Sequence, residues 1–334
     1  MNRVGVLGAG SWGTALAKLM ADQGIETVLW SRRSDQVDAI NRDHRNPRYV
    51  KDAALPDCLH ATTDMRETLQ GADFVIVAVP TAANREVLAD AVPVIAEGVP
   101  VLSATKGIEQ ETLKLVSGIF EDYFPSSMHD QLTFLGGPSF AREVTERVPT
   151  VVAVAGRHGE TRERVQRALN TERFRVYTTD DVIGVEVGGA LKNVMAIAAG
   201  IADGMKFGHN TRAAIITRGL TELTRMAVRL GGQPLTLMGL SGMGDLVLTC
   251  TGDLSRNRRV GIGLGEGKKL PQILDELGMV AEGVLTAKSA YALAIREGVE
   301  MPIAEQVYRI LYEEKPPEEA MVELMTRPLK AEAI

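Results

Sequence analysis

The sequence predicts an α/β domain with an open, doubly wound sheet, followed by an all-α second domain. Two observations carry this prediction. Short apolar runs alternate with helical patterns in the first half, and from Val182 onward the patterns are helical almost throughout. The length of 334 residues also suits two domains. We therefore expect one domain at residues 1–182 and a second at residues 183–334.

The first predicted strand, residues 4–7, ends in a glycine-rich turn. Its residues are Gly8, Ala9, Gly10, Ser11, Trp12 and Gly13, and a helical pattern follows. In this spacing the first glycine permits a tight turn, the second lets the backbone approach a pyrophosphate, and the third allows close packing of helix and strand. Since the strand and the helix are both readable, we interpret the turn as the dinucleotide-binding turn of a Rossmann-type domain. A glycine turn that binds nothing is the alternative.

The second predicted strand, residues 26–30, bears on the choice of dinucleotide. NAD sites usually place Asp or Glu after this strand, to bind the ribose 2′-hydroxyl. This chain has Arg32 and Arg33 there, whose charge and planar donors suit a 2′-phosphate. We therefore favour NADP(H) and leave NAD(H) open, with two solvated surface arginines as the alternative interpretation.

The first domain continues with a polar helix from residue 35 and a continuous apolar strand over residues 73–79, which Pro80 ends. A helix at 83–94 and strands at 99–104, 132–135, 150–155 and 174–177 follow. Continuous apolarity is typical of parallel strands that are buried on both faces. Ligands bind outside the carboxyl ends of such strands, so Lys106 and the turn from Gly136 to Ser139 are candidate site residues.

Six helices are predicted in the second domain, at residues 185–204, 213–230, 256–265, 271–277, 286–297 and 303–313. The first is apolar nearly all round and should be buried, yet Lys192 and Asn193 interrupt it. A lysine in such a helix must pair, reach solvent or take part in chemistry. Gly188 and Gly189 would let another element or a ligand approach that helix.

A basic turn precedes the predicted helix 256–265. Ser255 is a suitable N-cap, which places Arg256 and Asn257 in the first turn. A cation there opposes the helix dipole unless an anion is bound, so the turn indicates a phosphate or carboxylate site. A solvated basic turn explains these residues equally well. Asp245 could orient Lys192, bind a substrate hydroxyl or serve only as a turn residue.

The composition disfavours several classes of partner. The net charge is −6 and there is no basic block, so we expect no nucleic acid and no anionic membrane as a partner. No apolar run is expected to span a membrane. Cys58, Cys250 and the five histidines lack metal-like spacing, which predicts no metal. Two cysteines cannot form a disulfide framework, which predicts a reducing, cytoplasmic location. The run 261–269 fails as a phosphate loop, because Ile262 stands where a glycine is needed and Lys269 replaces Ser or Thr.

Taken together, these motifs resemble those of bacterial NAD(P)-dependent glycerol-3-phosphate dehydrogenases. The resemblance covers essentially the whole chain. The stretches that carry it, in order, are residues 8–17, 105–108, 137–141, 190–194, 244–246 and 254–257.

The resemblance implies reversible hydride transfer between dihydroxyacetone phosphate and sn-glycerol 3-phosphate, which supplies phospholipid biosynthesis. It implies that Lys192 gives and takes the proton at the substrate oxygen, that Lys106 touches cofactor and substrate, and that Arg256 bridges the substrate phosphate and the cofactor. The other implied substrate residues are Gly137, Ser139, Asp245, Ser255 and Asn257. The other implied cofactor residues are Ser11, Trp12, Arg32, Arg33, Ala141, Val280 and Glu282. The family often has Thr at position 139, and Ser keeps the hydroxyl.

Two alternatives remain. Ketopantoate reductases and 3-hydroxyacid dehydrogenases share the glycine turn and an all-α second domain, but typically carry Lys-x-x-x-Asn on the catalytic helix. Here Ala196 is the fourth residue after Lys192, and Asn193 is adjacent to it. A non-catalytic NADPH-binding protein would need no lysine in a buried helix. The apolar second domain is compatible with a homodimer.

Overall fold

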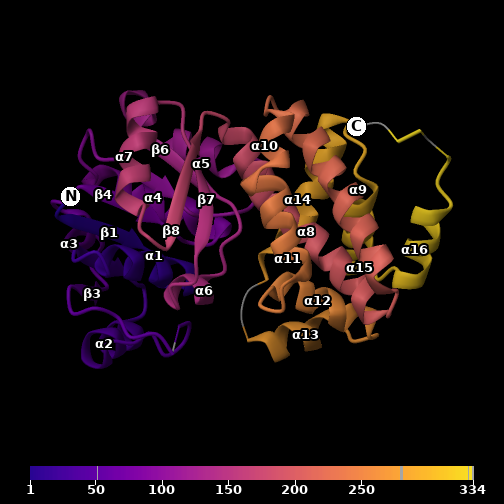
Figure 1. Ribbon diagram of the computed structural model, residues 1–334, viewed down its shortest axis with the longest axis horizontal. Helices are drawn as coiled ribbons and strands as arrows, with labels where there is room; N and C mark the ends of the chain where they lie inside the picture. Colours follow the sequence, from indigo (N-terminus) through magenta and orange to yellow (C-terminus); the bar gives the residue numbers. More distant parts are fainter. Residues whose placement is uncertain (51, 279–280, 330, 333–334) are drawn as a thin grey trace. The chain divides into compact units, whose positions relative to one another are not determined.

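The computed structural model describes residues 1–50, 52–278, 281–329 and 331–332. The chain divides into two units, and the colours of Figure 1 follow the sequence through them. The first comprises Met1–Lys106 and Val116–Val182, and the second comprises Gly107–Leu115 and Ile183–Ile334. A short segment from the first half of the sequence therefore belongs with the second unit.

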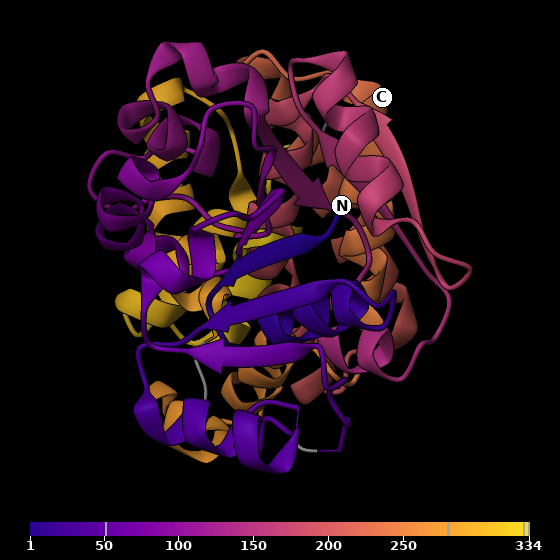
Figure 2. The same ribbon diagram turned by 90° about the vertical axis from the view of Figure 1, so that its left-hand side faces the viewer.

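The first unit is built on an eight-stranded sheet with the order β3-β2-β1-β4-β5-β6-β7-β8. Neighbouring strands are parallel except β6 and β7, which pair antiparallel. Figure 2 views this unit, with the indigo strands near the N-terminus side by side. The strands are β1 (Arg3–Leu7), β2 (Glu26–Trp30), β3 (Leu59–Thr62), β4 (Phe74–Val77), β5 (Val101–Ser103), β6 (Leu132–Gly136), β7 (Thr150–Ala155) and β8 (Phe174–Thr179). The predicted fold class is confirmed.

Strand β3 was not predicted from the sequence. It has four residues, includes the polar His60, and pairs with β2 at the edge of the sheet. A strand so short carries too little apolar periodicity to stand out. Its register is nevertheless regular, with Leu59 opposite Thr27 and Thr62 opposite Trp30.

Helices of the first unit connect and cover these strands. They are α1 (Ser11–Ala21), α2 (Ser34–Asp43), α3 (Met65–Leu69), α4 (Asn84–Ala91), α5 (Val116–Tyr123), α6 (Ala141–Thr145) and α7 (Gly159–Leu169), with short 3₁₀ turns η1 (Thr81–Ala83), η2 (Val92–Val94) and η3 (Ser126–Gln131). The core joins apolar residues of α1, such as Leu16 and Met20, to Val6 and Ile76 of the central strands. The glycine turn between β1 and α1 is thereby fixed to the middle of the sheet.

The second unit is helical where the structure describes it. Its helices are α8 (Val182–Gly204), α9 (Gly208–Arg229), α10 (Pro234–Met238), α11 (Asp245–Thr251), α12 (Arg256–Gly265), α13 (Leu270–Leu277), α14 (Glu282–Glu297), α15 (Pro302–Tyr312) and α16 (Pro317–Met325), with a π-helical turn η4 (Leu240–Gly244) before α11. The predicted bounds of α12 are confirmed. Helices α10, α11 and α16 were not predicted, because five to nine residues show too few helical repeats.

Helix α8 is the central core helix of the second unit (Figure 1). It is apolar, as predicted, and begins three residues earlier than predicted, so that by length and composition alone it could cross a membrane. However, 94% of its most apolar window is buried inside the fold, as in the core helix of a soluble protein. Burial of apolar surface within the protein therefore accounts for its composition.

Glycines bring α8 and α12 into backbone contact. A Cβ on Gly200 would lie 2.1 Å from the carbonyl oxygen of Arg258, and a Cβ on Gly261 would lie 2.1 Å from that of Ile197. Gly204 and Gly265 meet in the same way one turn further along. Glycines of the run 261–269 therefore serve helix packing, which fits its rejection as a phosphate loop.

Candidate active site

The turn between β1 and α1 needs two of its glycines for its own backbone. Gly8 has a φ of +111°, which L side chains rarely adopt. A Cβ on Gly13 would lie 1.8 Å from the carbonyl oxygen of Gly8, a distance that no side chain could tolerate. At Gly10, by contrast, a Cβ would meet no atom of the described protein within 4 Å. Space is therefore open above Gly10, at the N-terminus of α1.

Two buried amides hold this turn in place. The carbonyl oxygen of Ala9 accepts hydrogen bonds from Gln36 Nε2 at 2.6 Å and from Asn46 Nδ2 at 3.0 Å. Asn46 Nδ2 also donates to Thr14 Oγ1 at 2.8 Å, and Gln36 Nε2 donates to Asn46 Oδ1 at 3.1 Å. The sequence does not indicate a role for either residue, because a single amide in a polar segment gives no sign of burial.

Arg32 and Arg33 follow β2, as predicted, and their side chains are exposed. Arg33 donates to the carboxylate of Asp35 through Nε at 3.1 Å and Nη2 at 2.6 Å. This pairing lowers the pKa of Asp35. Arg32 lies 3.5 Å from a carboxylate oxygen of Glu86. Exposed pairs of this kind are weak in water, so both guanidinium groups can exchange their partners for an anionic ligand.

Lys106, Gly137 and Ser139 come together at the carboxyl ends of β5 and β6. Lys106 Nζ donates to the carbonyl oxygen of Gly137 at 3.3 Å, and Ser139 Oγ donates to the same oxygen at 3.1 Å. Gly137 has a φ of +109°. Ala141 begins α6 shortly after this turn. The first unit thus gathers a lysine and a hydroxyl at the edge of the sheet where α/β proteins bind ligands.

In the second unit, Lys192 donates a hydrogen bond to the carboxylate of Asp245, the first residue of α11. Both residues are buried, with 7% and 0% of their surface exposed. Thr249 Oγ1 donates to the carbonyl oxygen of Asp245 at 2.6 Å. Of the three roles considered for Asp245, the contact supports the one that orients Lys192. Thr249 was missed, because its role depends on the helical spacing from Asp245.

Gly188 makes this ion pair sterically feasible. A Cβ at position 188 would lie 2.2 Å from the carbonyl oxygen of Ser241 in η4. The η4 turn leads directly into Asp245, and Lys192 lies one helical turn after Gly188. The expectation that Gly188 lets another element approach the helix is therefore confirmed.

An amide chain links three helices beside the ion pair. Asn257 Nδ2 donates to Asn193 Oδ1 at 2.9 Å, and Asn257 Oδ1 accepts from the N–H of Gly283 at 2.9 Å. Ser255 is the N-cap of α12, as predicted, and its Oγ accepts from the N–H of Arg258 at 3.2 Å. The start of α12 is thus tied to α8 and to α14.

Glu282, the first residue of α14, lies within electrostatic range of Arg256. Burial raises the pKa of the Glu282 carboxyl, and the charge of Arg256 counteracts this shift. The structure therefore brings together Arg256 and Glu282, two of the predicted cofactor residues. Val280, a third, lies outside the described residues.

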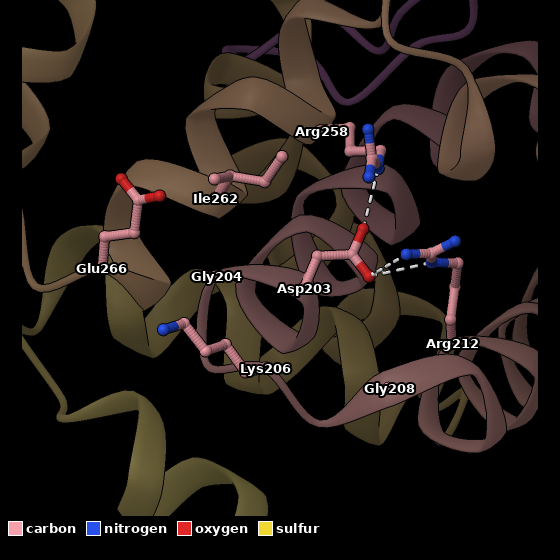
Figure 3. Close-up of a pocket in the computed structure, with 8 residues that line it drawn as sticks. All are labelled: Asp203, Gly204, Lys206, Gly208, Arg212, Arg258, Ile262 and Glu266. Atoms are coloured by element: carbon pink, nitrogen blue, oxygen red, sulfur yellow. Dashed lines mark hydrogen bonds and ion pairs between the residues drawn. The ribbon is translucent and has the colours of Figure 1, made fainter.

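A pocket of about 490 Å³ opens elsewhere in the second unit (Figure 3). It is lined by Asp203, Gly204, Lys206, Gly208, Arg212, Arg258, Ile262 and Glu266. None of the predicted site residues lines it. Within the described part of the chain, no group of three or more His, Cys, Asp or Glu side chains is placed to hold a metal ion.

Comparisons with known proteins show which family the chain matches along most of its length. The chain matches the NAD-dependent glycerol-3-phosphate dehydrogenase N-terminus over residues 3–162 and the C-terminus of the same family over residues 181–322. It is 53% identical over 330 residues to glycerol-3-phosphate dehydrogenase (NAD(P)+) of Myxococcus xanthus, covering 99% of this chain and 98% of that protein. The corresponding protein of Leptospira biflexa is 50% identical over 332 residues, covering 99% and 100%.

Solved structures agree with this assignment. A glycerol-3-phosphate dehydrogenase from Coxiella burnetii is 40% identical with a TM-score of 0.92, covering 98% of this chain and 99% of that one. A ketopantoate reductase from Ralstonia eutropha, one of the alternative classes, matches with a TM-score of 0.61 at 15% identity, covering 96% and 99%. The second likeness extends to the fold alone.

Proposed function

The chain belongs to the NAD-dependent glycerol-3-phosphate dehydrogenase family, and from this we propose that it interconverts dihydroxyacetone phosphate and sn-glycerol 3-phosphate. In the reducing direction a hydride adds to the ketone carbon and a proton adds to the ketone oxygen. The observation that carries the chemical assignment is the buried Lys192–Asp245 pair, which provides a proton donor on a rigid helix. The product would serve as the glycerol backbone of phospholipids.

The residues of the first unit fit a nicotinamide dinucleotide. The space above Gly10 is open, and α1 begins there without a side-chain cap, so its first N–H groups can bind a pyrophosphate. The indole N–H of Trp12 is buried without a hydrogen-bond partner among the described residues, and a bound cofactor could supply that partner if the ring turned toward it. When bound, the reduced cofactor supplies the hydride. Ser11, Trp12 and Ala141 would line it.

Arg32 and Arg33 carry the preference for NADP(H). Both guanidinium groups are solvent-exposed and positively charged, and no acidic residue takes the place that binds a ribose 2′-hydroxyl in NAD sites. A 2′-phosphate would gain two charged partners there. NAD(H) lacks this phosphate and would bind more weakly.

Lys192 would protonate the developing alkoxide. The Asp245 carboxylate favours the charged ammonium form and fixes its position, and burial strengthens the electrostatic interaction of the ammonium group with the substrate oxygen. In the reverse direction the neutral amine would take the proton from the substrate hydroxyl. Lys192 therefore acts as both general acid and general base.

Arg256, Asn257 and Ser255 would bind the substrate phosphate at the start of α12. The first turn of α12 contains no acidic residue, so an anion is the natural partner of its N–H groups and of Arg256. Glu282 would hold Arg256 in place for its contact with the cofactor. Lys106, Gly137 and Ser139 would complete substrate binding. Phosphate binding remote from the reacting carbon supplies orientation.

The first experiment follows the loss of NADPH absorbance with dihydroxyacetone phosphate, beside parallel assays with NADH and with ketopantoate. Oxidation of NADPH with dihydroxyacetone phosphate, and none with ketopantoate, would support the proposal. Equal rates with NADH would keep the reaction and refute the cofactor preference. Turnover with ketopantoate alone would move the assignment to that reductase class.

Replacement of Arg256 by alanine tests the phosphate site separately. Loss of a charged hydrogen-bond partner should raise KM for dihydroxyacetone phosphate at least about 30-fold. Arg259 lies on the same helix but is exposed, so Arg259→Ala is a matched control that should leave KM unchanged. An equal effect of both variants would refute a specific phosphate contact.

A cytoplasmic location and a homodimer complete the proposal. Both cysteines are free, which suits a reducing compartment. Cell fractionation tests the location. Light scattering on the purified protein tests the dimer, and a monomeric mass at micromolar concentration would contradict it.

A further inference from the structure

Asp203, in the last turn of α8, binds two arginines that come from two other helices (Figure 3). Its Oδ1 accepts from Arg212 of α9, through Nε at 2.8 Å and Nη2 at 2.6 Å. Its Oδ2 accepts from Nε of Arg258 of α12 at 2.8 Å. Only 9% of the Asp203 side chain is exposed, against 22% for Arg212 and 12% for Arg258. Charged hydrogen bonds with so little access to water are strong ones.

Arg258 is the residue through which Asp203 reaches the predicted phosphate-binding turn. It directly follows Arg256 and Asn257 in the first turn of α12. Its Nη1 also donates to Asp253 at 3.0 Å, just before that turn. One guanidinium group therefore fastens the turn 254–257 at both of its ends and connects it to α8.

Two further contacts restrict the position of α12 relative to α8. Gly200 packs against the carbonyl oxygen of Arg258, one turn before Asp203 on α8. Asn193, ten residues before Asp203, holds Asn257. The start of α12 is thus attached to α8 at both ends of a stretch of about 15 Å.

We infer that Asp203 is a positioning residue that sets the place of the phosphate-binding turn relative to Lys192, acting through Arg258. The inference rests on the proposed function, because the turn and the lysine serve the same substrate. Both ends of the substrate would be held by groups attached to one helix, α8. A small displacement of α12 would then weaken phosphate binding while Lys192 and Asp245 keep their contact.

The pocket of Figure 3 shows where the Arg258 side chain could move if its hydrogen bond with Asp203 were lost. Asp203, Arg212 and Arg258 all line it, and about 490 Å³ of open space adjoins their side chains. Without the carboxylate, Arg258 could turn into that space, and the turn 254–257 would keep its contact with Asn193 but lose its second attachment to α8. The pocket's two arginines are already bonded to Asp203, so the pocket needs no anionic ligand to explain them.

The two arginines provide a matched pair of variants. Arg258→Lys and Arg212→Lys each keep the charge and each replace a guanidinium group that makes two hydrogen bonds. Arg258 donates to Asp203 and to Asp253, whereas both bonds of Arg212 go to one oxygen of Asp203. Only Arg258 is attached to the phosphate-binding turn. We expect Arg258→Lys to raise KM for dihydroxyacetone phosphate about tenfold, or ~1.4 kcal/mol, with kcat within about twofold of the wild type. Arg212→Lys should leave both constants unchanged.

Asp203→Asn should reproduce the KM effect of Arg258→Lys, because it weakens the same bond from the other side. Thermal denaturation of all three variants checks that they fold. A purely structural role would lower the melting temperature of both arginine variants without separating their KM values. An equal KM for both arginine variants, with active wild-type protein, would overturn the inference alone. An inactive wild type would overturn the proposed function and this inference with it.

Discussion

At the scale of single residues, Lys192 and Asp245 show how two charged side chains can be buried together. Neither would be stable inside the helical core alone, since an unpaired buried charge costs several kcal/mol. Together they form an ion pair, and Thr249 Oγ1, one turn further along α11, lies 3.5 Å from the carboxylate oxygen Oδ1 of Asp245 that accepts from Lys192. The two residues are 53 positions apart in the sequence, so the sequence indicated each as a site residue but could not show that they are in contact.

Lys192→Ala should remove most of the turnover while cofactor binding persists. Removal of a general acid lowers kcat about 10²- to 10⁴-fold. The glycine turn and both arginines after β2 belong to the first unit, so the Kd for NADPH should stay within about twofold. Stopped-flow kinetics and fluorescence titration measure the two quantities. A near-normal kcat would remove Lys192 from the mechanism.

Gly10 and Gly13 predict opposite consequences for the same substitution. Gly13→Ala places a Cβ against the carbonyl oxygen of Gly8 and should destabilise the fold by about 3 kcal/mol or more. Gly10→Ala meets no protein atom and has an ordinary φ of −73°, so stability should stay constant or rise by up to about 1 kcal/mol. Its Cβ would occupy the space of the pyrophosphate.

The two glycine variants are compared by chemical denaturation and by NADPH titration. Gly10→Ala should lose at least about tenfold in NADPH affinity, or ~1.4 kcal/mol, in a fully stable protein. Gly13→Ala should unfold at a clearly lower denaturant concentration than the wild type. Wild-type NADPH affinity in the Gly10→Ala protein would show that no ligand approaches that position.

At the scale of secondary-structure elements, a buried carboxylate joins two helices of the second unit. Glu222 of α9 accepts hydrogen bonds from the first N–H groups of α15, those of Ile303 at 2.7 Å and Ala304 at 3.1 Å. Burial raises the pKa of Glu222 from 4.5 to about 7. The two N–H groups, and the charges of Arg225 and Arg327, only partly counteract this shift.

This pKa predicts that the contribution of Glu222 to stability falls as the pH rises. The folded protein keeps a proton on this carboxyl between pH 4.5 and about 7, whereas the unfolded chain releases it. The loss is of the order of 3 kcal/mol and is complete above about pH 7. Glu222→Gln cannot titrate, so the difference in unfolding free energy between wild type and variant isolates the effect. A difference independent of pH from 4 to about 8 would contradict the assignment.

Elements with strong local signals were predictable and those that depend on tertiary contacts were not. The bounds of α12 followed from the Ser255 cap and the helical pattern, and the structure places them as predicted. Strand β3 and helix α11 are too short to show a period, although α11 carries Asp245. The contacts of Gln36, Asn46 and Asp203 join segments distant in sequence, so no local sequence pattern predicts them.

At the scale of the whole molecule, the second unit is formed from two separate stretches of the sequence. Residues 1–182 contain the sheet, yet the segment Gly107–Leu115 belongs to the helical unit. Ile108, which is 3% exposed, is part of the core of that unit. Leu113 and Leu115 pack against the same core. A single boundary in the sequence therefore cannot separate the two units cleanly.

The segment predicts how the first unit behaves alone. A truncated chain of residues 1–182 would expose Ile108, whose full burial contributes about 1.5–3 kcal/mol, together with the partly buried Leu113 and Leu115. We expect that chain to aggregate. Replacing Gly107–Leu115 by a glycine-serine linker should give a soluble first unit that unfolds cooperatively and still binds NADPH, because the glycine turn, Gln36 and Asn46 remain. Equal solubility of the two truncated chains, measured by light scattering, would show that the segment does not need the second unit.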